Sequence, residues 1–206
     1  MNSTVILKGN ILYTPRPSEF ISIQHGYIIA VDGVVVYCGE SIPPAYADCE
    51  VTDYGDNLII PGFVDTHAHA PQYCNRGLGM DKELLPWLET YTFPEEAKFS
   101  DLDYARLVYG AFVQDLWRNG TTRSILFGTI HKESTLVLME LLQKAGLSAY
   151  VGKVNMDRNS PDYLCEKDAA TSLADTVRWL NDVEAKGYAN TKPILTPRFT
   201  PTCSDE

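Results

Sequence analysis

The sequence lacks the features of a membrane or nucleic-acid-binding protein. No apolar run approaches the roughly 18 to 20 residues that a membrane-spanning helix needs, and the N-terminus shows no basic stretch followed by a long apolar one. Basic residues are in the minority, with 17 Lys and Arg against 27 Asp and Glu, which gives a formal net charge of −10. This charge disfavours nucleic acid or an anionic membrane surface as a partner. We expect a cytoplasmic protein.

Cysteine is scarce, and its pattern gives no sign of a disulfide framework. The five cysteines are odd in number, widely spaced and without a C-x-x-C pair, so we expect neither disulfides nor a thiolate zinc site. The sequence also lacks a G-x-G-x-x-G motif after any predicted strand, which removes the usual argument for a dinucleotide-binding sheet. With 45% hydrophobic and 21% charged residues, the composition is that of a globular protein with its own core.

Residues 1–60 predict a small all-β module. Short apolar stretches rich in β-branched residues are separated by glycine-containing turns, among them His25–Gly26 and Asp32–Gly33. His25 therefore lies inside a predicted hairpin, where we expect it to be structural or solvated. The predicted strands cover residues 5–7, 11–13, 20–24, 27–31 and 34–38.

From residue 61 to 206 the pattern changes to apolar strands that alternate with amphipathic helices. Four strands joined by three helices predict right-handed βαβ crossovers and a parallel sheet. Without a dinucleotide motif, we favour the first half of a (β/α)8 barrel over an open doubly wound sheet, because a whole barrel needs about 250 residues. The strands are expected over 58–67, 121–127, 148–155 and 193–199, and the helices over 103–119, 133–145 and 171–186.

The connection between the first of these strands and its helix is long. Residues 70–100 exceed the few residues usual for a βα loop and are rich in apolar and aromatic side chains. Such a loop could fold over a ligand at the mouth of the barrel, or it could cap the hydrophobic core at that end. The sequence leaves both interpretations open.

The first barrel strand ends in the motif His67-Ala68-His69. Residues two apart on a strand point to the same side, so both imidazoles can reach one metal ion. Zinc accepts imidazole nitrogens, and a catalytic zinc keeps one position open for water. Two ordinary histidines are the alternative. Asp65 is expected to be a supporting carboxylate and no ligand, since a ligating histidine usually has an outer partner.

The segment from Ile60 to His69 closely resembles the first barrel strand of the amidohydrolase superfamily. Further segments resemble the guanine deaminase branch of that superfamily, so the resemblance covers nearly all of the chain after Leu58. These segments are Gln72, 87–94, 119–122, 129–131, 151–157 and 192–199. The resemblance implies an α/β fold in which a small β-sandwich module precedes a TIM-like metal-dependent hydrolase barrel. It also implies one zinc ion per subunit, bound by His67 and His69.

The same resemblance implies guanine as the substrate and hydrolysis at its C2 amino group, which yields xanthine and ammonia. A glutamine amide offers donors and an acceptor, an arginine offers a fork of donors, and a phenylalanine offers an aromatic face. The alternatives are a solvated Gln72, an ion-paired Arg198 and a Phe199 that belongs to the core. The implied substrate-binding residues are His69, Ala70, Pro71, Gln72, Arg198 and Phe199.

The family pattern places a catalytic glutamate, two further histidine ligands and an aspartate on later strands, beyond Glu206. We therefore assign no catalytic residue within the chain, and we expect these 206 residues to be an inactive and unstable fragment of a homodimeric enzyme. Zinc is the family expectation, although iron accepts the same ligands. The alternatives are an amidohydrolase that acts on a pyrimidine or triazine, and a non-catalytic homologue that acts as a binding protein.

Overall fold

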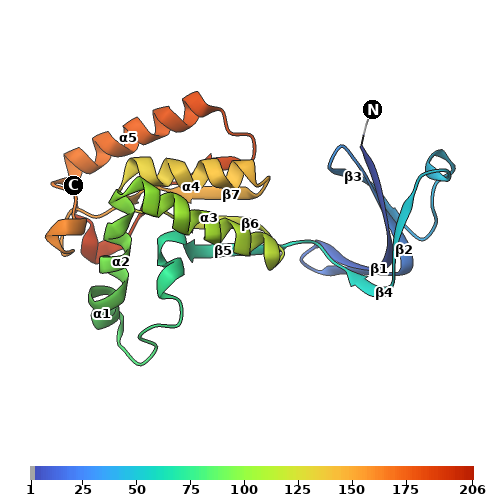
Figure 1. The fold of residues 1–206 in the computed structure, drawn as a ribbon, viewed down its shortest axis with the longest axis horizontal. Coiled ribbons are helices and arrows are strands. Elements are labelled where there is room, and N and C mark those ends of the chain that lie inside the picture. The colour runs from blue at the N-terminus through green and yellow to red at the C-terminus, as the bar shows by residue number, and fades with distance from the viewer. Residues whose placement is uncertain (1–2) are drawn as a thin grey trace. The chain divides into compact units, whose positions relative to one another are not determined.

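A computed structural model describes residues 3–206, and the chain divides after Pro61 into two units. The first unit is all-β, and the second, Gly62–Glu206, is α/β (Figure 1). Within residues 3–206, no helix combines the length and the apolar character that a membrane span requires. All five cysteines are free thiols.

The first unit contains one four-stranded sheet with the order β3-β2-β1-β4. Its strands are β1 (Thr4–Arg16), β2 (Glu19–Val31), β3 (Val34–Gly39) and β4 (Val51–Ile59), with a 3-10 turn, η1 (Pro44–Tyr46), before β4. β2 pairs antiparallel with β1 and β3, whereas β4 pairs parallel with β1. Ile6, Ile11 and Ile29 are buried and form the core of this unit.

Two long strands replace four of the short predicted ones, so the prediction of a turn at His25–Gly26 is wrong. His25 has a φ of 50° and lies inside β2, and its N–H donates to the side-chain oxygen of Asn10 at 3.1 Å. A bulge of this kind takes up an extra residue without ending the strand. The predicted turn at Asp32–Gly33 is confirmed, with φ values of 51° and 81°, as a two-residue hairpin turn requires.

The predicted strand over 58–67 is also divided, and residues 51–57 of β4 are missing from the prediction. β4 ends at Ile59, and β5 (Phe63–His69) begins a different sheet. Pro61 lies in the interval between them. Proline cannot donate a ladder hydrogen bond, which explains why an apolar run that looks continuous is interrupted there.

The second unit confirms the predicted parallel sheet. β5, β6 (Thr121–Phe127), β7 (Ser148–Gly152) and β9 (Thr191–Pro193) pair in parallel in the order of the chain. The helices α3 (Leu102–Arg118), α4 (Lys132–Lys144) and α5 (Ala169–Lys186) connect them and lie on one face of the sheet (Figure 1). An open doubly wound sheet carries helices on both faces, so this arrangement differs from that alternative.

The three long helices start and end within two residues of their predicted bounds. Their ends are set by capping residues that lie next to them in the sequence. Asp101 accepts hydrogen bonds from the N–H groups of Asp103 and Tyr104 and so caps the start of α3. At the other end of α5, Gly187 adopts a left-handed conformation with a φ of 60°, which glycine tolerates best. Such signals are contained in a few neighbouring residues.

The connection over 70–100 is largely helical, so its description as a long loop is wrong. It contains η2 (Ala70–Asn75), α1 (Leu84–Trp87), a π-helical turn η3 (Leu88–Thr92), α2 (Phe93–Ala97) and η4 (Lys98–Ser100). Leu88 and Phe93 pack with Val154, Met156 and Leu164 in a small apolar cluster. This packing supports the interpretation in which the connection caps the core. Leu84, Trp87 and Leu88 of the same connection also line a cavity, as the other interpretation expects.

The predicted strands over 148–155 and 193–199 are each broken into two. Beyond β7 and β9 the chain forms a separate parallel pair, β8 (Val154–Asn155) and β10 (Thr196–Pro197). At the break, the Thr196 hydroxyl donates to the carbonyl of Lys153 at 2.8 Å. A Cβ on Gly152 would lie only 2.2 Å from that hydroxyl, so the close approach depends on glycine.

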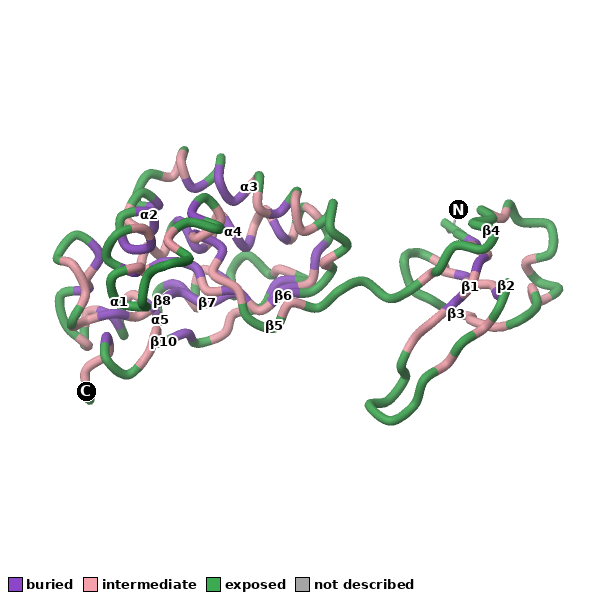
Figure 2. Tube along the Cα trace, turned by 90° about the horizontal axis from the view of Figure 1, so that it is seen from below, coloured by how far each residue is buried: buried purple, intermediate pink, exposed green. Residues whose placement is uncertain are grey.

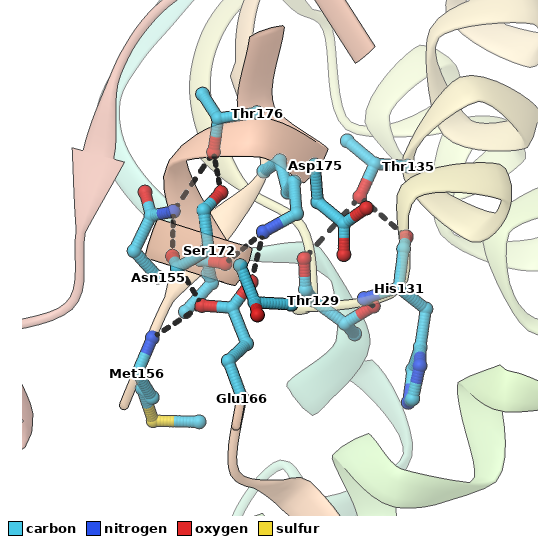
Figure 3. A network of polar contacts seen from close by, with 12 residues as sticks. Thr129, His131, Thr135, Asn155, Met156, Glu166, Ser172, Asp175 and Thr176 are labelled. Atoms are coloured by element: carbon cyan, nitrogen blue, oxygen red, sulfur yellow. Dashed lines mark hydrogen bonds and ion pairs between the residues drawn. The ribbon is translucent and has the colours of Figure 1, made fainter. Parts of the chain in front are cut away.

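A buried polar network holds the connection between β8 and α5 (Figure 3). Glu166 accepts hydrogen bonds from the ammonium of Lys153 at 2.5 Å, the N–H of Met156 at 3.0 Å and the hydroxyl of Ser172 at 2.6 Å. Asn155 donates to Ser172 at 2.6 Å. Each charge in the network is paired, which is the condition under which charged groups are tolerated in an interior.

The main core of the second unit lies between the helices and the sheet. Leu126 of β6, Leu138 of α4 and Val151 of β7 are fully buried there. Figure 2 shows the buried stretches following the strands and the inner faces of the helices. The sheet is therefore held in place mainly by apolar packing on its helical face.

We predict that Leu138→Ala lowers the free energy of unfolding by about 2 to 5 kcal/mol, because it leaves a cavity between α4 and the sheet. Leu107→Ala is the matched control, since Leu107 on α3 is 72% exposed and its loss should change stability by less than about 0.5 kcal/mol. Urea unfolding followed by circular dichroism measures both. Equal losses in the two variants would contradict the assigned core.

Candidate active site

His67 and His69 lie at the carboxyl end of β5, as the H-x-H spacing predicts. Their ring centroids are 5.3 Å apart, and the rings meet edge to face at 71°. The carboxylate of Asp65 accepts the backbone N–H of His67 at 3.1 Å. Asp65 thus supports the backbone of the motif and leaves both imidazoles free of its carboxylate.

The imidazole of His69 is held against an aromatic ring and is mostly buried. It stacks on Phe127, the last residue of β6, with centroids 4.5 Å apart and planes 16° from parallel. Among residues 3–206, its Nδ1 is buried without a hydrogen-bond partner. Burial, together with the nearby charges of Arg198 and His67, lowers the pKa of His69 to about 3. The ring is therefore neutral near pH 7.

Two polar side chains from distant parts of the chain meet at the buried carboxylate of Glu96. Arg198 donates to Oε2 of Glu96 at 2.5 Å, and both side chains are at most 4% exposed. Nε2 of Gln72 donates to the other oxygen, Oε1, at 3.0 Å. The guanidinium of Arg198 also lies 5.3 Å from the centroid of the Phe93 ring. The Glu96 carboxylate and the Phe93 ring therefore hold the Arg198 guanidinium from two sides, since cations are attracted to aromatic faces.

His67, His69, Gln72 and Arg198 line one cavity of about 490 Å³ in the second unit. The histidines lie beside the polar pair formed by Gln72 and Arg198, and several aromatic rings complete the wall. A volume of this size suits a small planar ligand, and the mixture of apolar walls with a few polar groups is typical of ligand sites. The cavity is lined by His67, Ala68, His69, Gln72, Leu84, Trp87, Leu88, Phe127, Arg198 and Phe199.

The structure brings five of the seven residues named from the sequence to this cavity and leaves two apart. His67, His69, Gln72, Arg198 and Phe199 line it. Ala70 and Pro71 are buried in η2, and Ala70 belongs to the main core. Their effect on the cavity is therefore limited to packing.

His131 lies at a different cavity. It precedes α4 as its N-terminal cap residue, and its neighbours there include Lys132, Glu133 and Glu166. Burial lowers the pKa of His131, and the nearby charge of Lys153 lowers it further. Its Nε2 is buried without a partner in the described part of the chain.

Sequence reasoning missed Glu96 and Phe127, both of which contact the predicted site residues. Glu96 is 1% exposed and follows another glutamate, so nothing in its type marks it out. A signal was nevertheless present. At helical spacing Glu96 falls on one face with Phe93 and Phe99, both buried, and a carboxylate on an apolar face needs a partner.

The cavity combines two kinds of chemical group, an imidazole pair of the type that can bind a metal ion and polar side chains beside aromatic rings. Two imidazoles lie close together, and a guanidinium and an amide lie beside aromatic walls. Within residues 3–206, no three side chains of His, Cys, Asp or Glu gather as a metal-binding group. Two histidines alone are fewer than the three protein ligands of a typical catalytic zinc site.

The comparisons with known proteins identify the family. A sequence profile described as the amidohydrolase family matches residues 58–206. The chain belongs to the amidohydrolase family. Among curated amidohydrolase relatives, it is 49% identical over 156 residues to a guanine deaminase from Dictyostelium discoideum, which covers 76% of this chain and 34% of that protein. It is 39% identical over 204 residues to a guanine deaminase from Escherichia coli (strain K12), covering 93% of this chain and 44% of that protein.

A solved structure agrees with this assignment. The guanine deaminase from C. acetobutylicum, with guanine bound in its active site, superposes on this amidohydrolase chain with a TM-score of 0.90 and 49% identity. The alignment covers 98% of this chain and 48% of that one. The chain thus spans between 34% and 48% of the length of these relatives.

We predict that Arg198→Met lowers the free energy of unfolding by about 3 to 5 kcal/mol, because it leaves the carboxylate of Glu96 buried without its cation. Arg118→Met is the matched control. Its ion pair with Asp115 is exposed, so its loss should cost no more than about 1 kcal/mol. Thermal or urea unfolding measures the difference, and similar losses in the two variants would show that Glu96 is solvated.

Proposed function

We propose that the complete protein hydrolyses guanine to xanthine and ammonia and that this amidohydrolase chain contributes to the active site. The observation that carries the proposal is the cavity that joins two histidines to Gln72, Arg198 and Phe199. It is supported by 49% identity to an enzyme solved with guanine in its active site. The alternative substrate is a pyrimidine or triazine ring, and an activity assay distinguishes it from guanine.

The proposal extends to the architecture around the site. In it, residues 61–206 form the first half of a (β/α)8 barrel, residues 1–60 belong to a β-sandwich module, and the complete protein is a cytoplasmic homodimer. The consecutive order β5-β6-β7-β9, with helices on one face, supports the barrel because each strand of a barrel is followed by an outer helix. Barrel active sites lie at the carboxyl ends of the strands, where His69 lies.

His67 and His69 fit a zinc ion and would contribute two of its ligands. The fit rests on two neighbouring imidazoles and on a buried nitrogen of His69 that has no partner among residues 3–206. Imidazole nitrogens are common zinc ligands. When bound, the ion supplies the acidity that makes water a nucleophile near neutral pH. We propose one such ion per subunit.

The remaining residues of the cavity would bind and orient the purine. Arg198 can donate to a ring oxygen or nitrogen, Gln72 can both donate and accept, and Phe199 offers an aromatic face. In the reaction, the oxygen of water bonds to C2, the bond from C2 to the amino nitrogen breaks, and ammonia leaves. A proton must reach that nitrogen, because the amide-like anion is a poor leaving group.

Two buried glutamates of the chain are poor candidates for that proton transfer. Glu96 and Glu166 each accept a hydrogen bond from a cation at 2.5 Å. Each carboxylate would have to leave its cationic partner in order to move a proton. We therefore assign neither of them as the general base.

We predict that the protein expressed from its complete coding sequence and loaded with zinc converts guanine to xanthine with release of one ammonia per guanine. Absorbance of xanthine and an enzymatic assay of ammonia measure the two products. Cytosine and an aminotriazine, tested in parallel, should be poor substrates. A preference for either of them would favour the alternative amidohydrolase reaction, and no activity at all would favour a binding protein.

We predict that His67→Ala and His69→Ala each lower the zinc content and reduce kcat/KM by more than about 100-fold. Even the loss of a residue that hydrogen-bonds to a metal ligand typically lowers metal affinity or activity by about 10- to 100-fold. His25→Ala is the control, since His25 lies in the first unit and outside the cavity. Zinc is measured by elemental analysis. Full zinc content in both cavity variants would exclude the proposed ligands.

A further inference from the structure

We infer that Glu96 is a positioning residue that fixes the hydrogen-bonding faces of Gln72 and Arg198, so that the cavity selects a ring with a lactam edge. A lactam edge presents a ring N–H beside a carbonyl oxygen, as in N1–H and C6=O of guanine. This inference rests on the proposed function and deepens it. Glu96 is buried and does not line the cavity, so it acts through its two neighbours.

The first step of the inference is the division of the carboxylate between two donors. Oε1 of Glu96 accepts from Gln72, and Oε2 accepts from Arg198. The three residues come from different elements, namely η2, α2 and the end of β10. One carboxylate therefore sets the orientation of two side chains that both line the cavity.

The second step follows from what a carboxylate can do. An ionised carboxylate only accepts hydrogen bonds, so Gln72 must turn its NH2 group towards Glu96. That choice leaves Oε1 of Gln72 as an acceptor, and within residues 3–206 no group donates to it. Amide orientation is otherwise ambiguous, because the two ends of an amide have nearly the same shape. Glu96 removes the ambiguity.

The third step is the complementarity of the two fixed groups. Beside the acceptor of Gln72 lies the guanidinium of Arg198, which carries only donors. An acceptor next to a donor matches a ring edge with N–H next to C=O. An amidine edge, with a bare ring nitrogen next to an amino group, reverses both partners, and unpaired buried polar groups make such a reversal costly.

The neighbouring glutamate provides a contrast within the same helix. Glu95 is also buried, but it accepts from Lys98 at 2.6 Å and from the hydroxyl of Tyr104. None of these three residues lines the cavity. Glu95 therefore shares the helix and the burial of Glu96 without its connection to Gln72 and Arg198.

The test compares Glu96→Gln with Glu95→Gln in the zinc-loaded protein expressed from its complete coding sequence. A glutamine at 96 must turn its NH2 group towards either Arg198 or Gln72, so a donor faces a donor and Gln72 can rotate. We expect kcat/KM for guanine to fall by about 10- to 100-fold, since hydrogen bonds to charged groups contribute this much. Zinc content should remain unchanged. Glu95→Gln should leave kcat/KM within about twofold.

The selectivity readout uses 2,6-diaminopurine, which differs from guanine only in its amidine edge. We expect the preference for guanine over this analogue to fall by about tenfold or more in Glu96→Gln, because the fixed acceptor is lost. A double-mutant cycle with Gln72→Leu adds a second readout. If Glu96 acts through Gln72, the two changes are not additive in kcat/KM.

The outcomes separate the two hypotheses. Wild-type protein that neither binds nor deaminates guanine overturns the proposed function and this inference with it. An active wild-type enzyme whose Glu96→Gln variant keeps its selectivity, or whose effects add to those of Gln72→Leu, overturns the inference alone. A Glu96→Gln variant that loses selectivity while Glu95→Gln keeps it supports the inference, even if both variants melt at lower temperature.

Discussion

The ion pair between Glu96 and Arg198 is the interaction on which the geometry of the candidate site depends. Its partners are 102 residues apart in the chain, and the contact is almost completely buried. Two charges in such a place are stable only together, because either one alone would lose its hydration without compensation. The pair therefore holds the connection after β5 against the end of β10, and the cavity lies between them.

A second buried ion pair lies elsewhere in the α/β unit, and its two charges also compensate each other. Lys153, which directly precedes β8, pairs with Glu166 in the connection after β8. The hydroxyl of Ser172 in α5 also donates to the carboxylate of Glu166 and so ties this connection to the helix (Figure 3). Both pairs join a strand end to a connecting segment, where backbone packing alone is weak. Apolar packing builds the layers of the unit, and the two buried pairs hold connecting segments against the ends of strands.

The elements that the sequence predicts well are those determined by residues close together in the chain. Helices such as Leu102–Arg118 follow from periodicity and caps, and the H-x-H motif carries its own geometry at the end of β5. Helical spacing places Glu96 on a face with Phe93 and Phe99, but its partner Arg198 could not be found in this way, since it lies 102 residues away. The break between β7 and β8 could not be predicted either, because Lys153 there contacts Glu166 and Thr196, which lie 13 and 43 residues later.

The bridging carboxylate couples the stability of the site to its choice of ligand. Gln72 and Arg198 both line the cavity, but the carboxylate that orients them does not. A change at any one of the three leaves a buried polar group of the other two unpaired, so their effects cannot be independent. The specificity of such a site is therefore determined partly by a residue that the ligand never touches. A comparison confined to cavity-lining side chains would miss it.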